Sequence, residues 1–231
     1  FMYKISELIE LVPEDFEFQG SNKPIYSKLR NNFINGLRGE FGNKYDNLID
    51  FLSSTDYFYA PAAAKYHDNH PGGLYYHSMK VYSNLLYYNS IMNNKWDKDS
   101  LFIVGFLHDL CKIGLYKMEI LGEYNDGLNN IITDYGYSYN NLGYDTKVFH
   151  GTKSLETLGK IGLPENIMTE ELCYSIVYHM GVWTLDAPDY KSALEKYDLV
   201  FFTHSADMLA SRSSRTITKI SLDNNRNVLI N

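Results

Sequence analysis

The residues of this sequence with the clearest chemical potential are the adjacent pair His108 and Asp109, which follow an apolar run over 101–106. Adjacent residues on a helix point about 100° apart, so these side chains cannot share one helical face, but both can reach a metal ion at the helix edge. Lys112 follows His108 by four residues, so its ammonium group can project over the same place and meet a phosphate oxygen. His108, Asp109 and Lys112 together indicate metal and phosphate chemistry, although a lone His-Asp pair is more often a surface or capping feature.

Further histidines and an aspartate stand on the helices that must position this pair. His77 lies on the inward stripe of a helix predicted over 74–92, His150 opens one over 150–162, His179 ends one over 169–180, and Asp207 lies within one over 192–212. Each histidine also has a structural explanation, as a hydrogen-bonded core residue or a helix-terminal residue. Asp207 is harder to explain in this way, because a carboxylate in so apolar a helix is costly unless it is paired or bound to a metal.

The bulk composition restricts the classes of protein to consider. A length of 231 residues with 45% apolar and 21% charged residues suits one well-buried domain. The formal charge of −7 leaves no basic field, which argues against binding of extended duplex nucleic acid. Cys111 and Cys173 form no CxxC unit, so we expect neither a disulfide framework nor a zinc knuckle, and no apolar run approaches the length of a membrane span. We therefore expect a cytoplasmic protein without a membrane partner.

The periodicity of apolar residues predicts an all-α fold, a mainly helical bundle, with one small insertion. We expect a helical N-terminal extension over 1–53 with helices at 3–11, 25–37 and 45–52, a core over 54–212, and a polar tail over 213–231 with a short strand at 216–222. The helix that carries His108 and Asp109 is predicted over 99–112. Alternating tyrosines and glycine turn signals over 115–149 predict a small β-hairpin or an irregular flap, which we expect to cover the metal site.

The order of these residues resembles the HD-domain metal-dependent phosphohydrolases, in which one helix supplies a histidine, a second supplies His-Asp and a distant one supplies an aspartate. His77, His108, Asp109 and Asp207 match that order, and His150 and His179 correspond to the two additional histidines of the binuclear subgroup. Five runs carry the resemblance, which covers 55–212: HPGGLYYHS at 70–78, HDLCK at 108–112, HGTKS at 150–154, YHMG at 178–181 and HSAD at 204–207. The first resembles the HxGGLxxHS motif of stand-alone bacterial and phage HD hydrolases and of HD-type 3′-to-5′ exoribonucleases. Those exoribonucleases carry an oligonucleotide-binding barrel ahead of this domain, whereas the first fifty residues here look helical.

The resemblance implies six metal ligands and two divalent transition-metal ions. Imidazole and carboxylate ligands suit Mn, Fe, Co, Ni or Zn better than Mg or Ca. Asp109 is the natural bridging ligand, because a carboxylate has two oxygens to share. Two such ions would lower the pKa of a bridging water and hold phosphoryl oxygens for in-line attack.

Other polar residues are candidates for work on the substrate. Lys112, Lys117 and Lys153 are expected to neutralise charge on the phosphoryl group, and Trp183 lies in a loop expected to shape the substrate pocket. His67 and His70, on the loop before the first ligand helix, could donate to a phosphate or protonate a leaving oxygen, or have only a structural role. His204 shares a helical face with Asp207 and is expected to orient that carboxylate.

The sequence thus predicts a metal-dependent phosphohydrolase that cleaves a phosphate ester of a small nucleotide, either a phosphomonoester or a small phosphodiester. One alternative is a 3′-to-5′ exonuclease on short single strands, for which the many tyrosines could supply stacking platforms. The other is a metal-binding or nucleotide-sensing module without turnover, which the presence of all six ligand positions and Lys112 disfavours.

Overall fold

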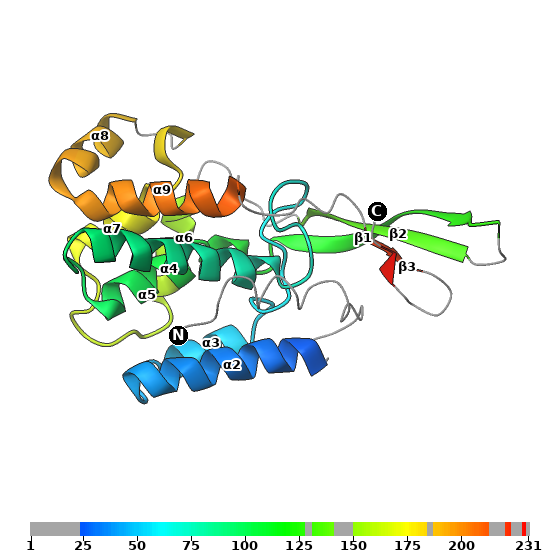
Figure 1. Ribbon diagram of the computed structural model, residues 1–231, viewed down its shortest axis with the longest axis horizontal. Coiled ribbons are helices and arrows are strands. Elements are labelled where there is room, and N and C mark those ends of the chain that lie inside the picture. Colours follow the sequence, from blue (N-terminus) through cyan, green and yellow to red (C-terminus); the bar gives the residue numbers. More distant parts are fainter. Residues whose placement is uncertain are drawn as a thin grey trace.

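The computed structural model of the protein describes residues 24–127, 131–140, 150–183, 187–212, 220–222 and 228–229 and is mostly helical (Figure 1). Its helices are α2 (Pro24–Phe41), α3 (Asp46–Ser53), α4 (Gly73–Ile91), α5 (Lys98–Leu107), α6 (His150–Gly159), α7 (Glu170–Val177), α8 (Ala187–Lys196) and α9 (Asp198–Arg212), with 3-10 turns η1 (Leu110–Lys112) and η2 (Gly181–Trp183). The predicted all-α class with a small β-hairpin is confirmed. Within the described part of the chain, no helix combines the length and hydrophobicity needed to cross a membrane.

Helix α4 is the element around which the ligand-bearing helices assemble. It packs against α5 on one side and α9 on the other, and α7 contacts both α9 and α6 (Figure 1). Leu74, His77, Val81 and Leu85 recur at helical spacing on its buried face. This packing places His77 between the two helices that carry His108 and Asp207.

A cluster of aromatic rings fixes α5 against the N-terminal helices. Phe33 of α2 is fully buried, and its ring centroid lies 5.5 Å from that of Phe58 and 5.4 Å from that of Phe106. The Tyr57 hydroxyl donates a hydrogen bond of 2.8 Å to the Phe106 carbonyl. Such buried rings contribute both apolar area and preferred edge-to-face contacts. They hold the last turn of α5, directly before His108, in a defined place.

Two glycines let ligand-bearing helices approach their neighbours closely. A Cβ atom on Gly105 of α5 would lie 2.7 Å from the Tyr82 Cα atom of α4. A Cβ atom on Gly151 of α6 would lie 2.2 Å from the Val177 carbonyl oxygen at the end of α7. Both distances are shorter than van der Waals contact, so a larger side chain would force each pair of helices apart.

The predicted insertion is an antiparallel hairpin of β1 (Tyr116–Asn125) and β2 (Ile131–Tyr139), paired from Tyr116 with Tyr139 to Asn125 with Ile131. Strand β3 (Ile220–Leu222) pairs with β2, and β4 (Val228–Leu229) pairs with β3, so the expected C-terminal strand completes a four-stranded sheet. Both long strands project away from the helices (Figure 1). Only the start of β1 stays near the site, where Tyr116 interacts electrostatically with Lys112 and Asp109. Residues 141–149 lie outside the described residues, so the expectation that 115–149 covers the metal site stays a prediction.

Four predicted helix boundaries on the ligand-bearing segments need correction. Helix α6 ends at Gly159, three residues before the predicted end at 162. Helix α5 ends at Leu107 instead of continuing to 112, because the Asp109 backbone (φ −108°, ψ 22°) leaves the helical region and the chain tightens into η1. Helix α7 ends at Val177, so His179 lies in the turn that follows it. The helix predicted over 192–212 is two helices that meet at Tyr197.

The break at Tyr197 has a tertiary cause. The Tyr197 hydroxyl donates to the Glu170 carboxylate of α7 at 2.6 Å, and the backbone N–H of Leu199 donates to Glu171 Oε1 at 3.3 Å. Two adjacent glutamates of α7 thus bind the end of one helix and the free donors at the start of the next. Elsewhere α2 runs on to Phe41, past the predicted end at 37, and the helix predicted over 3–11 lies outside the described residues.

Candidate metal centre

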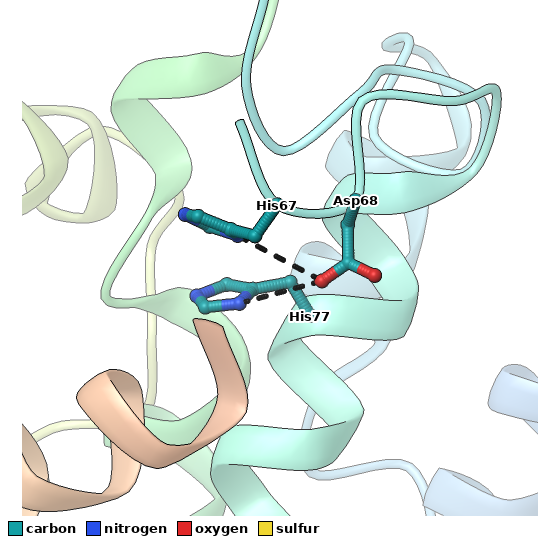
Figure 2. A group of neighbouring side chains, drawn as sticks. All are labelled: His67, Asp68 and His77. Atoms are coloured by element: carbon teal, nitrogen blue, oxygen red, sulfur yellow. Dashed lines mark ion pairs between the residues drawn. The ribbon is translucent and has the colours of Figure 1, made fainter. Parts of the chain in front are cut away.

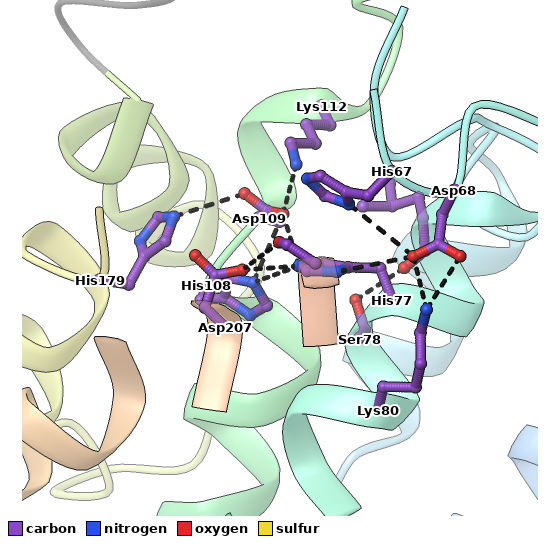
Figure 3. A network of polar contacts seen from close by, with 12 residues as sticks. His67, Asp68, His77, Ser78, Lys80, His108, Asp109, Lys112, His179 and Asp207 are labelled. Carbon is purple, nitrogen blue, oxygen red and sulfur yellow. Dashed lines mark hydrogen bonds and ion pairs between the residues drawn. The ribbon is translucent and has the colours of Figure 1, made fainter. Parts of the chain in front are cut away.

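The structure brings together all six residues predicted as metal ligands. Figure 3 shows five of them, all except His150. They come from different elements: His77 from α4, His108 from the end of α5, Asp109 from the residue before η1, His150 from the start of α6, His179 from the turn after α7 and Asp207 from α9. His77, His108, Asp109 and His179 are at most 2% exposed.

The Asp109 carboxylate lies at the centre of this group, and its two oxygens face different histidines. Oδ1 lies 2.6 Å from His150 Nε2 and 3.5 Å from His179 Nε2. Oδ2 lies 3.4 Å from His108 Nε2 and 3.5 Å from His77 Nε2. One carboxylate therefore separates four imidazoles into two pairs, as a ligand shared between two ions would.

Backbone carbonyls at helix ends set the orientation of two imidazoles. His108 Nδ1 donates to the carbonyls of Val104 and Gly105 at 3.2 and 3.1 Å, and His179 Nδ1 donates to the Ile176 carbonyl at 2.7 Å. Because a carbonyl can only accept, Nδ1 carries a proton in both rings, and Nε2 is the nitrogen that faces the other side chains of the group. His179 Nε2 is buried and has no hydrogen-bond partner among the described residues. A buried imidazole nitrogen without a hydrogen-bond partner is suited to a metal ion.

His77 has a carboxylate on each side of its ring. Nε2 lies 3.0 Å from Asp207 Oδ1 and 3.3 Å from His108 Nε2, and Nδ1 lies 3.8 Å from Asp68 Oδ2. Burial lowers the pKa of His77 to about 4, so the ring is neutral and has one proton for two nitrogens. If the proton is on Nδ1, the Nε2 lone pair of His77 faces the Asp207 carboxylate and His108 Nε2. That arrangement is favourable only when a cation lies among these three groups.

The charges of the group also favour bound cations. Burial would raise the pKa of Asp109, but the Lys112 ammonium, with Nζ 2.6 Å from Oδ2, holds it far below its usual range. Burial would likewise raise the pKa of Asp207, but the neighbouring histidines, His77 foremost, lower it. Both carboxylates are therefore ionised at neutral pH. Lys112 balances one of the two charges, and a divalent cation would balance the remainder.

Cys111 is near the group but is not suited to metal binding. Its sulfur and atoms of Asp109 and His150 lie within 4.8 Å of one another. Burial raises the pKa of the thiol to about 12, so it stays protonated, and its backbone N–H donates to Ser154 Oγ at 3.1 Å. This agrees with a site of imidazoles and carboxylates.

Of the three lysines predicted to bind substrate, one points into the candidate metal centre and two pair with glutamates. Lys112 is 6% exposed and points at Asp109 (Figure 3). Lys117 on β1 pairs with Glu119 at 2.7 Å, and Lys153 on α6 pairs with a glutamate one turn further on at 2.9 Å. The geometry therefore favours Lys112 alone of the three as a phosphate partner.

Other predicted residues have partners that the sequence did not indicate. His204 Nδ1 donates to the His179 carbonyl at 2.7 Å, so His204 supports the backbone of His179. The expectation that it orients Asp207 stays a prediction. Trp183 is 64% exposed, and its ring centroid lies 6.3 Å from that of His204. This indole is available at the surface beside the element that carries His179.

His67 and His70 flank a carboxylate that the sequence analysis missed. His67 Nδ1 lies 3.7 Å from Asp68 Oδ2, and His70 Nε2 lies 3.7 Å from Asp68 Oδ1 (Figure 2 shows His67 and Asp68). His70 is only 4% exposed and its Nδ1 donates to the Pro71 carbonyl, so the structural explanation suits it better than donation to a substrate. The His67 side chain keeps 21% exposure.

No family model, curated protein or solved structure matches this chain. The geometry of the described side chains, together with the order of the motifs that carry them, is therefore the basis for assigning a function.

Proposed function

We propose that this protein is a metal-dependent phosphohydrolase of the HD-domain type, which cleaves a phosphomonoester or small phosphodiester of a nucleotide. The proposal depends mainly on the position of the Asp109 carboxylate between two pairs of histidines. Its Oδ1 faces His150 and His179, and its Oδ2 faces His77 and His108. A carboxylate between two sets of imidazoles is the arrangement that two-metal hydrolysis requires.

The donor set fits two divalent transition-metal ions such as Mn, Fe, Co, Ni or Zn. His77, His108 and Asp207 would hold one, His150 and His179 the other, and Asp109 would be shared by both. When bound, such ions supply an acidified water and compensate charge on the phosphoryl oxygens. The backbone carbonyls that accept from His108 and His179 keep both Nε2 atoms directed at the site.

Two side chains would act on the phosphate itself. Lys112 Nζ, held by Asp109 Oδ2, would donate to a phosphoryl oxygen and neutralise the negative charge that develops there. Its burial strengthens that interaction, because little water screens it. The ring of His67 lies over that of His77, with centroids 4.7 Å apart, and would protonate the leaving oxygen.

Two features support a small nucleotide as the substrate. A formal charge of −7 disfavours a long polyanion, which needs a basic groove. The exposed Trp183 ring, beside the turn that carries His179, can stack on a base. Exonuclease activity on short single strands is the second candidate, because Tyr66 and Trp183 are 73% and 64% exposed and could stack successive bases.

A substrate screen tests the proposal. Protein loaded with Mn²⁺ is incubated with nucleoside mono-, di- and triphosphates, cyclic dinucleotides and short oligonucleotides, and the products are separated by chromatography. We expect turnover of a small nucleotide, and we expect Asp109→Ala to abolish it while the helical circular dichroism signal is retained. Turnover by Asp109→Ala at the wild-type rate would exclude the assignment. Preference for oligonucleotides would favour the second candidate.

A further inference from the structure

Asp68 is a buried carboxylate whose position suggests a role beside the metal site. It is 3% exposed, and Lys80 Nζ contacts both of its oxygens, at 2.9 and 2.8 Å. Lys80 follows His77 by three residues on α4, so the pair and the ligand share one turn of the same helix. The Lys80 ammonium thus pairs with the carboxylate through both oxygens.

Two imidazoles point at the same oxygen of this carboxylate (Figure 2). His67 Nδ1 and His77 Nδ1 lie 3.7 and 3.8 Å from Asp68 Oδ2. Both nitrogens are buried and have no hydrogen-bond partner among the described residues. Each separation is about 1 Å longer than an N–H···O hydrogen bond, so a small rotation of either ring would close it.

A third metal ion is one explanation for this cluster, since His67, Asp68 and His77 offer ligand atoms within 4.8 Å of one another. The Lys80 ammonium argues against it. It already contacts both carboxylate oxygens, and a cation bound there would lie against a like charge in a buried place. Lys80 thus supplies the positive charge that a metal ion would otherwise bring.

The backbone holds Asp68 in this position before any ligand binds. Its φ of 47° is in the left-handed region, and its carbonyl accepts from the Ala62 N–H at 3.0 Å. A Cβ atom on Gly73, the first residue of α4, would lie 1.9 Å from that same carbonyl oxygen. The loop is therefore packed directly on the helix that carries His77, and Asp68 cannot easily move away.

We propose that Asp68, fixed by Lys80, positions the His77 and His67 imidazoles by accepting from their Nδ1 atoms. His77 then presents its Nε2 lone pair to the metal site, and His67 keeps Nε2 for the substrate. The inference rests on the proposed function, because it assumes that His77 binds a metal ion. A cation at Nε2 also makes Nδ1–H a stronger donor, which favours closing the gap to Asp68.

Co²⁺ titration followed by visible absorption tests this positioning role independently of turnover. Asp68→Asn preserves shape and removes the charge, and it should weaken Co²⁺ binding roughly 10- to 100-fold and alter the absorption bands. Lys80→Met keeps the carboxylate and should weaken binding by less, whereas Lys80→Arg should retain wild-type affinity. Because Lys80 acts through Asp68, the double variant should bind like Asp68→Asn alone.

Lys44→Met is the matched control, because it breaks a Lys–Asp pair of similar length, 2.8 Å to Asp99, away from the metal ligands. It should bind Co²⁺ like the wild type. If the wild type binds no Co²⁺, the proposed function fails. If the wild type binds two ions and Asp68→Asn binds them equally well, the positioning role is refuted while the metal site stands.

Two further outcomes would also overturn the inference. A third Co²⁺ ion in the wild type that is lost in Asp68→Asn would make Asp68 a ligand instead of a positioning residue. Additive effects in the double variant would show that Lys80 does not act through Asp68. Circular dichroism verifies folding, and if Asp68→Asn does not fold, unchanged binding in Lys80→Met would count against the role.

Discussion

Lys112 and the imidazoles of the candidate metal centre have different proposed roles. Lys112 is 6% exposed. Burial lowers the pKa of its ammonium group, but the Asp109 carboxylate and other neighbours raise that pKa by more than burial lowers it, so Lys112 remains charged. The 3-10 turn η1 brings Lys112 back over Asp109, three residues earlier. In the proposed mechanism it contacts the phosphoryl group, whereas the imidazoles bind the metal ions.

Replacing Lys112 with methionine should therefore separate turnover from metal binding. We expect Lys112→Met to lower kcat by roughly 10²- to 10³-fold, the usual effect of removing one group that stabilises transition-state charge. Two ions should remain bound, because no ligand is lost. Steady-state kinetics on the best nucleotide substrate and metal analysis of the same sample measure both effects.

Lys153→Met is the matched control, since Lys153 is also a lysine on a ligand-bearing segment but pairs with Glu156. It should change kcat less than about twofold, as expected for surface substitutions. An equal loss of kcat in the two variants would show that turnover depends on the overall positive charge of the protein and not on the Lys112 ammonium.

The sequence allowed the six clustered residues to be identified, but not the residues around them. Histidines at helix ends stand out by type, and the motif order connects them. Asp68 looks like an ordinary turn residue, because only the packing of its loop on α4 brings it to His77. His204 was assigned to Asp207 from helical spacing, whereas the chain turn after α7 brings the His179 carbonyl to it.

At the scale of elements, the crossing of α4 and α5 sets the separation of His77 and His108. Gly105 makes that crossing possible, because its Cα lies so near Tyr82 that no side chain fits between them. His108 follows Gly105 by three residues and His77 precedes Tyr82 by five, so both lie within about one and a half helical turns of that contact. Any change in helix spacing is transmitted directly to the metal site.

We therefore expect Gly105→Ala to lower the free energy of unfolding by about 1–3 kcal/mol, as overpacking does, and to weaken Mn²⁺ binding. Urea denaturation and metal titration measure the two effects. Gly39→Ala in the exposed part of α2 is the control, because nothing lies within 4 Å of its Cβ position. It should be neutral or stabilise the protein by up to about 1 kcal/mol. Equal stability of the two variants would contradict the close-crossing argument.

The hairpin offers a second prediction at this scale. Because β1 and β2 project away from the helices, replacing 119–136 with a short Gly-Ser turn should leave two-metal binding intact (Figure 1). Hydrolysis of p-nitrophenyl phosphate and of the best nucleotide should both stay within about threefold of wild type, as for changes outside the site. A selective loss on the nucleotide would show that the hairpin contacts the substrate.

Helix existence was predictable from apolar spacing, but helix ends were not. The break at Tyr197 depends on Glu170 and Glu171, which lie more than twenty-five residues earlier. The end of α5 depends on how Asp109 leaves the helical conformation at the site itself. Both ends are set by tertiary contacts, which local periodicity does not report.

For the molecule as a whole, the proposed metal ions would couple folding to metal binding. Asp109 and Asp207 are buried and ionised, and four imidazoles surround them. Only one ammonium group, that of Lys112, lies against these two carboxylates among the described residues. Ions that bind the folded chain should therefore stabilise it by mass action.

We expect the melting temperature of chelator-treated protein to rise when Mn²⁺ is restored. One site filled at a hundredfold excess over Kd adds about 2.7 kcal/mol, which corresponds to a rise of roughly 5–10 °C for a chain of this size. Scanning calorimetry measures it. Asp109→Ala should show a much smaller rise, and an equal rise in that variant would place the stabilising ions elsewhere.

The number of ions per chain tests the central claim most directly. Wild-type protein, His179→Ala and His204→Ala are dialysed against Mn²⁺, and metal and protein are quantified by inductively coupled plasma mass spectrometry and amino-acid analysis. We predict two ions per chain for the wild type, one for His179→Ala, and two for His204→Ala, whose ring supports only the His179 backbone. Fewer than two ions in the wild type, or two in His179→Ala, would contradict the two-metal account.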